Sequence, residues 1–347
     1  MATTFAVPDG RVAMAATLYT GNGSTQTISN AVNGVSFQPD FIWFKGRNQI
    51  TNHLAQDVIR GAGYGLNPNA TNVEANGVGT GLTAFGSSGF SLSGDFSGAG
   101  SCNSNTFTYV GWQWKAGGTA VSNTAGTITS SVSANTTAGF SVVTYTGTGA
   151  NATVGHGLGV APSFILIKSR NNVDNWYAYH SAIGNTGALN LNTTGATITN
   201  SGYWNNTTPT ASVFTIGTIP SQSTWTYVAY CWAPVAGYSA FGSYTGNGSA
   251  DGTFIYTGFR PRYVLIKCSS STGSWFINDT SREPVNLMNV SLRAETSDSE
   301  ASGGGLAMDA LSNGFKMRDA GSGSNGSGLI YIYAAFAENP LKYSNAR

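Results

Sequence analysis

A strand-like motif of seven residues occurs three times in this chain and constrains the fold more than any other feature. It reads Pro-Asp-Phe-Ile-Trp-Phe-Lys at residues 39–45, Pro-Ser-Phe-Ile-Leu-Ile-Lys at 162–168 and Pro-Arg-Tyr-Val-Leu-Ile-Lys at 261–267. Upstream of each copy lies Tyr-Thr-Gly-x-Gly, starting at Tyr19, Tyr145 and Tyr244, and downstream lies an aromatic segment at 109–114, 227–232 and 331–336. Landmarks that recur in one order predict an internal repeat.

Each copy has the pattern of an antiparallel β-sandwich. Short runs of β-branched and aromatic residues are separated by Gly, Asn and Ser turns, which is typical of sandwiches and jelly rolls. The nearly continuous apolar motif predicts a central strand with both faces covered and its proline at the start. We expect an all-β chain of three tandem antiparallel β-sandwich, jelly-roll-like repeats, with domains 1–118, 119–237 and 238–347. In the Thr- and Ser-rich stretch 117–139, an edge strand near 127–132 is favoured over a linker.

The composition excludes several classes of protein. Charged residues make up 9% of the chain and the formal net charge is +1, whereas charged residues are about 25% of a typical domain. With 41% hydrophobic residues the chain does not have the composition of a disordered protein. The basic residues are scattered, so no nucleic-acid partner is expected. The apolar runs are too short for a membrane helix, and residues 1–12 do not resemble a secretory signal; we expect no membrane insertion.

The cysteines and histidines do not have metal-site spacing. Cys102, Cys231 and Cys268 are far apart without a CxxC pair, which predicts buried, unpaired thiols. His53 and His156 lack a second histidine at ligand spacing. We expect no metal and no cofactor, and we expect His156, in a glycine-rich turn, to be solvated.

One position of the repeat carries residues that could take part in binding or catalysis. Twelve residues after the motif lysine comes Asp57, His180 or Asp279, and Arg60 and Arg282 follow the two aspartates by three residues. The structural interpretation is a loop clamped by a charge-assisted hydrogen bond. The functional interpretation is a carboxylate that binds a sugar or a metal.

The run Trp-Tyr-Ala-Tyr-His at 176–180 is compatible with an aromatic surface for a glycan or with a half-buried strand. The motif lysines Lys45, Lys168 and Lys267 are expected to cover the core edge with their stems and to place their charged ends in water. No catalytic residue is predicted. The candidate binding residues are Trp176, Tyr177, Tyr179, His180, Asp57 and Asp279.

Several long segments resemble a known family. The segments 126–149, 154–162 and 335–347, with 14–23 and 37–43, are similar to a domain of tail-fibre-like virion proteins of tailed bacteriophages. The resemblance covers nearly the whole chain and implies a structural protein of the particle, without catalytic or ligand residues to carry over. The chain departs from a typical fibre, because it lacks heptads and collagen-like triplets. Its position on the particle is therefore open.

These observations predict a virion protein and not an enzyme. The leading hypothesis is a tail fibre or tail tip protein on the particle surface that binds other virion proteins and a host cell-surface glycan or receptor. The alternatives are a capsid or tail decoration protein and, from another class, a glycan-degrading depolymerase. Because sheet edges need a cover, we also expect a homo-oligomer, with a trimer favoured.

Overall fold

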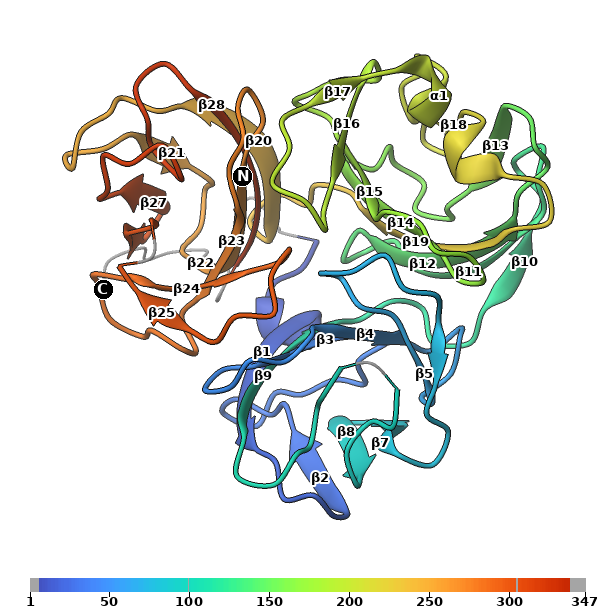
Figure 1. The fold of residues 1–347 in the computed structure, drawn as a ribbon, viewed down its shortest axis with the longest axis horizontal. Helices are drawn as coiled ribbons and strands as arrows, with labels where there is room; N and C mark the ends of the chain where they lie inside the picture. The colour runs from blue at the N-terminus through green and yellow to red at the C-terminus, as the bar shows by residue number, and fades with distance from the viewer. Residues whose placement is uncertain (1–5, 99, 304, 338–347) are drawn as a thin grey trace.

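The computed structural model describes residues 6–98, 100–303 and 305–337, and these form an all-β molecule of antiparallel sheets (Figure 1). The expected all-β sandwich fold is confirmed. Residues 1–5 and 338–347, at the ends of the first and third predicted domains, lie outside the described residues, as does most of the segment 335–347. No helix in the described part of the chain is long and apolar enough to cross a membrane.

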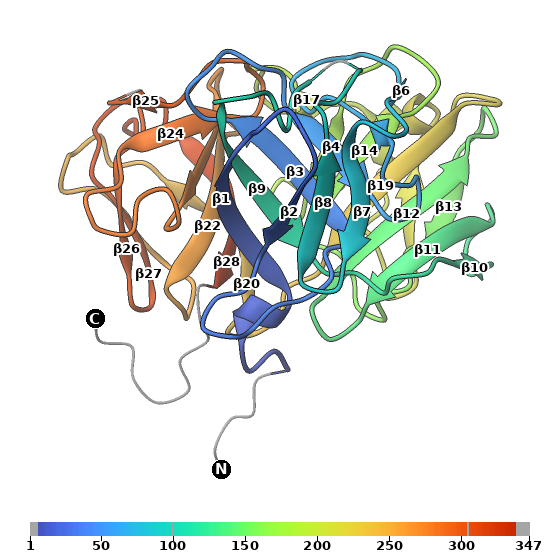
Figure 2. The ribbon, with the colours of Figure 1, turned by 90° about the horizontal axis from the view of Figure 1, so that it is seen from below.

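The first segment, residues 14–114, forms a four-stranded main sheet and a smaller sheet. The main sheet has the order β1 (Met14–Thr20), β9 (Thr108–Trp114), β3 (Phe41–Gly46), β4 (Leu54–Asp57). The small sheet has the order β2 (Gln26–Ser29), β8 (Gly89–Ser93), β7 (Gly81–Gly86), and β5 (Tyr64–Gly65) pairs with β6 (Ala75–Asn76). Figure 2 shows the small sheet standing in front of β3 and β9.

The second segment, residues 121–232, has a longer main sheet. Its order is β10 (Val121–Asn123), β11 (Ser130–Asn135), β12 (Phe140–Thr146), β19 (Thr226–Trp232), β14 (Phe164–Ser169), β15 (Tyr177–His180), β16 (Gly187–Asn190), β17 (Ile198–Thr199). β13 (Ala152–Gly155) pairs with β18 (Val213–Ile216), near the one-turn helix α1 (Ser201–Trp204). The strand expected at 127–132 is β11, three residues further along, and it is not the expected edge strand, because β10 pairs with its outer side.

The third segment, residues 239–337, has a six-stranded main sheet and a three-stranded small sheet. The main sheet has the order β20 (Ser239–Thr245), β28 (Ile330–Ala337), β22 (Pro261–Cys268), β23 (Trp275–Asp279), β24 (Val290–Arg293), β25 (Ala301–Ser302). The small sheet has the order β21 (Phe254–Tyr256), β27 (Gly314–Met317), β26 (Met308–Leu311).

Four strands are paired in the same order in every segment. The strand that ends in Tyr-Thr pairs with the aromatic closing strand, which pairs with the motif strand, which pairs with the strand after it. The register agrees as well: Tyr19 lies opposite Tyr109, Tyr145 opposite Tyr227 and Tyr244 opposite Tyr331, and each pair of rings is stacked. That the segments are three copies of one fold stays a prediction, which their superposition in an experimental structure would test.

The motif strands are central, and their alternate side chains enter different cores. On β3, Phe41 and Trp43 belong to the core shared by all three segments, whereas Ile42 and Phe44 face the small sheet of their own segment. This alternation follows from the two-residue period of a strand. Because both faces of the strand are covered, the side chains on both faces are apolar. The continuous apolar run of the motif predicts this arrangement.

The three main sheets surround one shared core (Figure 1). Trp114, Trp232 and Phe336, near the ends of the three closing strands, are all buried there. The ring of Trp114 lies 5.9 Å from that of Trp232 and 5.6 Å from that of Phe336. Their meeting was not predicted from the sequence. The segments therefore depend on one another for burial of their largest side chains.

Candidate functional site

The repeat position occupied by Asp57, His180 or Asp279 lies where two segments meet. Asp57, at the end of β4, is buried; its Oδ2 accepts a hydrogen bond from Nε of Arg60 at 2.5 Å, and its Oδ1 accepts from the backbone N–H groups of Ile59 and Arg60. The hydroxyl of Tyr230, on β19 of the second segment, donates to the same Oδ2 at 2.8 Å. The aspartate thus clamps its own loop and also binds the neighbouring segment.

Asp279 makes the same contacts between the third and first segments. Its Oδ2 accepts from Nε of Arg282 at 2.6 Å and from the indole N–H of Trp112, on β9, at 3.0 Å. Burial by itself would raise the pKa of Asp279, but the charge and hydrogen bonds of Arg282, with the bond from Trp112, outweigh it and hold the pKa below its usual value. The carboxylate is therefore ionised and paired.

His180 completes the cycle between the second and third segments. Its Nε2 lies 3.1 Å from the carbonyl oxygen of Tyr333 on β28, and its Nδ1 accepts from the backbone N–H of Ala182. Burial lowers the pKa of His180 to about 4. The ring is neutral at pH 7, and these partners place its proton on Nε2.

Two of the three junctions carry a longer charged network. At the junction of the first and second segments, Arg60 contacts Glu74, which binds Arg170 of the second segment at 2.8 Å. The junction of the first and third segments has the same sequence of partners: Arg282 contacts Glu300, which binds Arg47 of the first segment at 2.8 Å. These glutamates were not singled out by the sequence analysis.

The third junction is a neutral version of the same contact. The backbone N–H of Thr197 donates to the carbonyl of Ser269, as Glu74 does to Arg170 and Glu300 to Arg47. Relative to the charged junctions, all four side chains have changed together: Asp to His180, Arg to Ile183, Glu to Thr197 and Arg to Ser269. The third junction thus differs from the charged junctions at all four positions.

The aromatic run on β15 is also part of the interior. The indole N–H of Trp176 donates to the carbonyl of Asn67 in the first segment at 2.8 Å, Tyr177 donates to Asp174, and Tyr179 packs edge-on against Trp204. All six candidate binding residues are at most 4% exposed. A ligand on the molecular surface reaches none of them, because all six side chains are buried in the interior.

Two expectations about solvent exposure are wrong. Lys45, Lys168 and Lys267 are buried, and their ammonium groups donate to backbone carbonyls. Burial lowers the pKa of each to about 8. His156 is buried too, with Nε2 facing the carbonyl of Thr210. The next residue of each strand and carbonyls of nearby loops supply the acceptors that water was expected to supply.

The cysteines behave as expected. Cys102, Cys231 and Cys268 are free and buried. Burial raises the pKa of Cys102 and Cys231 above the usual thiol value, so neither is a thiolate at pH 7. Within residues 6–98, 100–303 and 305–337, no three His, Cys, Asp or Glu side chains are gathered in a way that could hold a metal ion.

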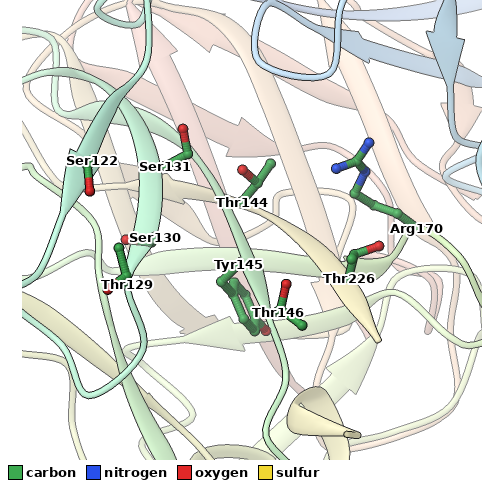
Figure 3. Close-up of a pocket in the computed structure, with 9 residues that line it drawn as sticks. All are labelled: Ser122, Thr129, Ser130, Ser131, Thr144, Tyr145, Thr146, Arg170 and Thr226. Atoms are coloured by element: carbon green, nitrogen blue, oxygen red, sulfur yellow. The ribbon is translucent and has the colours of Figure 1, made fainter. Parts of the chain in front are cut away.

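A polar hollow of about 330 Å³ opens where the second main sheet extends past the shared core (Figure 3). Ser131 lies opposite Thr144, and both side chains project to the same side as Arg170, whereas Tyr145 projects to the other side. Exposed Ser and Thr in a strand carry no sequence signal, so this feature was missed. Its lining residues are Ser122, Thr129, Ser130, Ser131, Thr144, Tyr145, Thr146, Arg170 and Thr226.

The hollow has the chemistry of a binding surface. Its hydroxyl groups both donate and accept hydrogen bonds, and the Arg170 guanidinium at its side is held by Glu74. None of the nine lining residues is a carboxylate, a histidine or a cysteine.

Comparison with known proteins gives a family. A family model described as a domain of unknown function, DUF7483, matches residues 12–340. No curated protein and no solved structure matches the chain.

Proposed function

We propose that this chain, which belongs to the DUF7483 family, is a structural protein of the tailed-bacteriophage virion, located at the tail fibre or tail tip, where it contacts the host surface. The observation that carries the proposal is the structural role of three residues that the sequence marked as candidates for chemistry. Asp57, His180 and Asp279 join the segments into one body. The proposal assigns no catalytic step to them.

The arrangement of the sheets suits a protein that presents surfaces to partners. The main sheets face inward, and the small sheets and their loops lie at the periphery (Figure 1). Ser, Thr and Asn side chains at that periphery offer adaptable hydrogen bonds on a rigid support. The resemblance of segments 126–149 and 154–162 to tail-fibre-like virion proteins supports the same role.

Labelling of intact particles tests the proposal. Gold-labelled antibody against the purified chain, viewed by negative-stain electron microscopy, is expected to mark the tail fibre or tail tip. Label on the head or along the tail tube would favour the decoration protein instead. Particles without label would contradict a virion role, and release of oligosaccharides from host polysaccharide by the purified chain would favour the depolymerase.

A further inference from the structure

Two aromatic side chains lie exposed next to each other on the small sheet of the third segment. Phe254 and Tyr256 on β21 are 44% and 67% exposed, whereas Ile255 between them is buried at 5%. Residues two apart on a strand project to the same face, so the two rings stand on the outer face of the sheet. Adjacent exposed rings form an apolar patch, and such patches on soluble proteins mark binding surfaces.

Charged side chains lie beside this patch. Lys316, on β27, is directly opposite Phe254, and Asp309, on β26, is directly opposite Lys316. Lys316 Nζ lies 2.5 Å from the carboxylate of Asp251, and Arg318 contacts Asp309 at 3.0 Å and Asp251 at 3.6 Å. Two carboxylates are thus balanced by two cations in one cluster.

A hollow of about 580 Å³ adjoins the cluster. Asp251, Asp309 and Arg318 line it, together with Asn286 and Leu287. Carboxylate, guanidinium and amide groups therefore line a hollow on the other side of Lys316 from Phe254. The outer face thus offers exposed apolar rings and hydrogen-bonding groups on one small sheet.

The other segments lack the aromatic pair at the matching positions. The small sheets share a register in which Ile255 faces Phe315, Ile28 faces Phe90 and Val154 faces Phe214. The residues on either side of the central one are Thr27 and Ser29 in the first segment and Thr153 and Gly155 in the second. The fold itself does not require aromatic residues there.

We propose that this outer face, formed by Phe254, Tyr256 and the cluster of Asp251, Asp309, Lys316 and Arg318, binds a saccharide chain. The C–H face of a sugar ring packs against an aromatic ring, and its hydroxyl groups bond to carboxylate and guanidinium groups. The balanced charge of the cluster favours an uncharged, hydroxyl-rich ligand over a polyanion. The inference rests on the proposed function in that it names the class of host-surface molecule contacted.

Glycan binding by the full chain tests the inference. The probe is a printed array of purified bacterial O-antigen and capsular polysaccharides, and a glycan that the native chain binds is then titrated by biolayer interferometry. Tyr256→Ser and Phe254→Thr install the residues of the first segment. Each is expected to weaken binding about tenfold or more, because exposed aromatic anchors dominate such interfaces.

A matched control separates this face from a general loss of exposed apolar surface. Val121→Thr replaces a methyl group of a 65% exposed side chain on β10 by a hydroxyl group and is expected to leave binding unchanged. All three substitutions are at exposed positions, so the melting temperature of each variant should equal that of the native chain. A native chain that binds no glycan on the array, or variants that bind as well as the native chain, would overturn the inference.

Two further results would also separate the competing explanations. If Tyr256→Ser changes the oligomeric state in light scattering without changing glycan binding, the face contacts a second copy and the inference is wrong. A chain that labels the tail but binds no polysaccharide would overturn the inference and leave the proposed function standing. A chain that binds glycan through Tyr256 but is absent from the particle would overturn the proposed function alone.

Discussion

At the scale of single residues, Arg60 has the largest set of partners of the first junction. Its buried guanidinium donates to Asp57, Glu74, the carbonyl of Ala55 and the hydroxyl of Tyr230. A buried ion pair gains little over an apolar pair, because both charges lose their hydration. Removing one partner is costly, since the other charge stays buried without compensation.

We therefore predict that Arg60→Leu lowers the free energy of unfolding by about 3–5 kcal/mol. The matched control is Arg170→Leu, whose side chain is 27% exposed and pairs with Glu74, and which should cost about 1 kcal/mol or less. Urea denaturation of both variants measures the difference. Equal losses would show that the Asp57 carboxylate does not depend on Arg60.

His180, at the junction of the second and third segments, predicts that the free energy of unfolding depends on pH. Burial lowers its pKa from 6.5 to about 4, so between these values the unfolded chain binds the proton and the folded chain does not. The stability contributed by the neutral ring is complete above pH 6.5 and is lost as the pH falls to 4, by up to about 3 kcal/mol.

The variant His180→Gln isolates this contribution. The stability difference between the native chain and the variant, from urea denaturation at several pH values, should shrink between pH 6.5 and pH 4. His53 and His156, whose pKa values burial also lowers, are present in both proteins and cancel. A difference that is constant with pH would contradict the prediction.

The sequence located these residues but not their roles. Spacing from the motif lysine found Asp57 and Asp279, and the arginine three residues later predicted the clamp, which is confirmed. Their other partners, Tyr230 and Trp112, lie more than 150 residues away in the chain. No local pattern reports such a contact, so residues that join segments resembled binding residues.

At the scale of elements, all three junctions share one backbone hydrogen bond. The side chains around it are charged at two junctions and neutral at the third. The closing strands differ as well. Opposite the fifth residue of the motif, the third segment has Ala334, whereas the first and second segments have Trp112 and Tyr230. The alanine side chain at 334 cannot donate a hydrogen bond to position 180 as Trp112 and Tyr230 do to the aspartates. The neutral set around His180 is consistent with this, because an aspartate there would lack the arginine at 183 and the donor from the closing strand that Asp57 and Asp279 have.

Converting the third junction to the charged type tests whether the four positions act together. His180→Asp alone should lower the free energy of unfolding by about 3–5 kcal/mol, because it buries an unpaired carboxylate beside Ile183. Adding Ile183→Arg, Thr197→Glu and Ser269→Arg should recover more than half of the loss in urea denaturation. These three substitutions without His180→Asp are the control, and a quadruple variant no more stable than the single variant would contradict the coupling.

Strands with strong apolar patterns were predictable, and weakly patterned ones were less so. The motif segments correspond to β3, β14 and β22, in the central places that their continuous apolar runs indicate. β11 was placed three residues early and was expected at the sheet edge, although it lies between β10 and β12, because Ser and Thr alternate there without a clear apolar face. The exposed pair on β21 was missed since an aromatic residue in a strand usually indicates a core position.

At the scale of the whole molecule, oligomerisation stays a prediction. Each chain already places three segments around one core, so a trimer would bring nine such segments together. The edge strands β10 and β25 are mostly exposed, and an exposed edge favours association with another chain. Light scattering of the purified chain is expected to give a homo-oligomer, with a trimer favoured, and a stable monomer at high concentration would contradict this.

The central structural claim is that the three segments form one cooperative unit because they share the core around Trp114, Trp232 and Phe336. Three sandwiches with separate cores would unfold separately, whereas segments that bury each other's aromatic residues should unfold together. Truncation of one shared side chain should then destabilise the whole chain and not one segment.

Differential scanning calorimetry of the native chain and of Trp232→Ala tests this claim most directly. We expect one transition for each protein, with equal calorimetric and van't Hoff enthalpies, and a loss of about 3–5 kcal/mol that moves the whole transition of the variant to lower temperature. Two or more transitions, of which Trp232→Ala moves one and leaves the others in place, would contradict it.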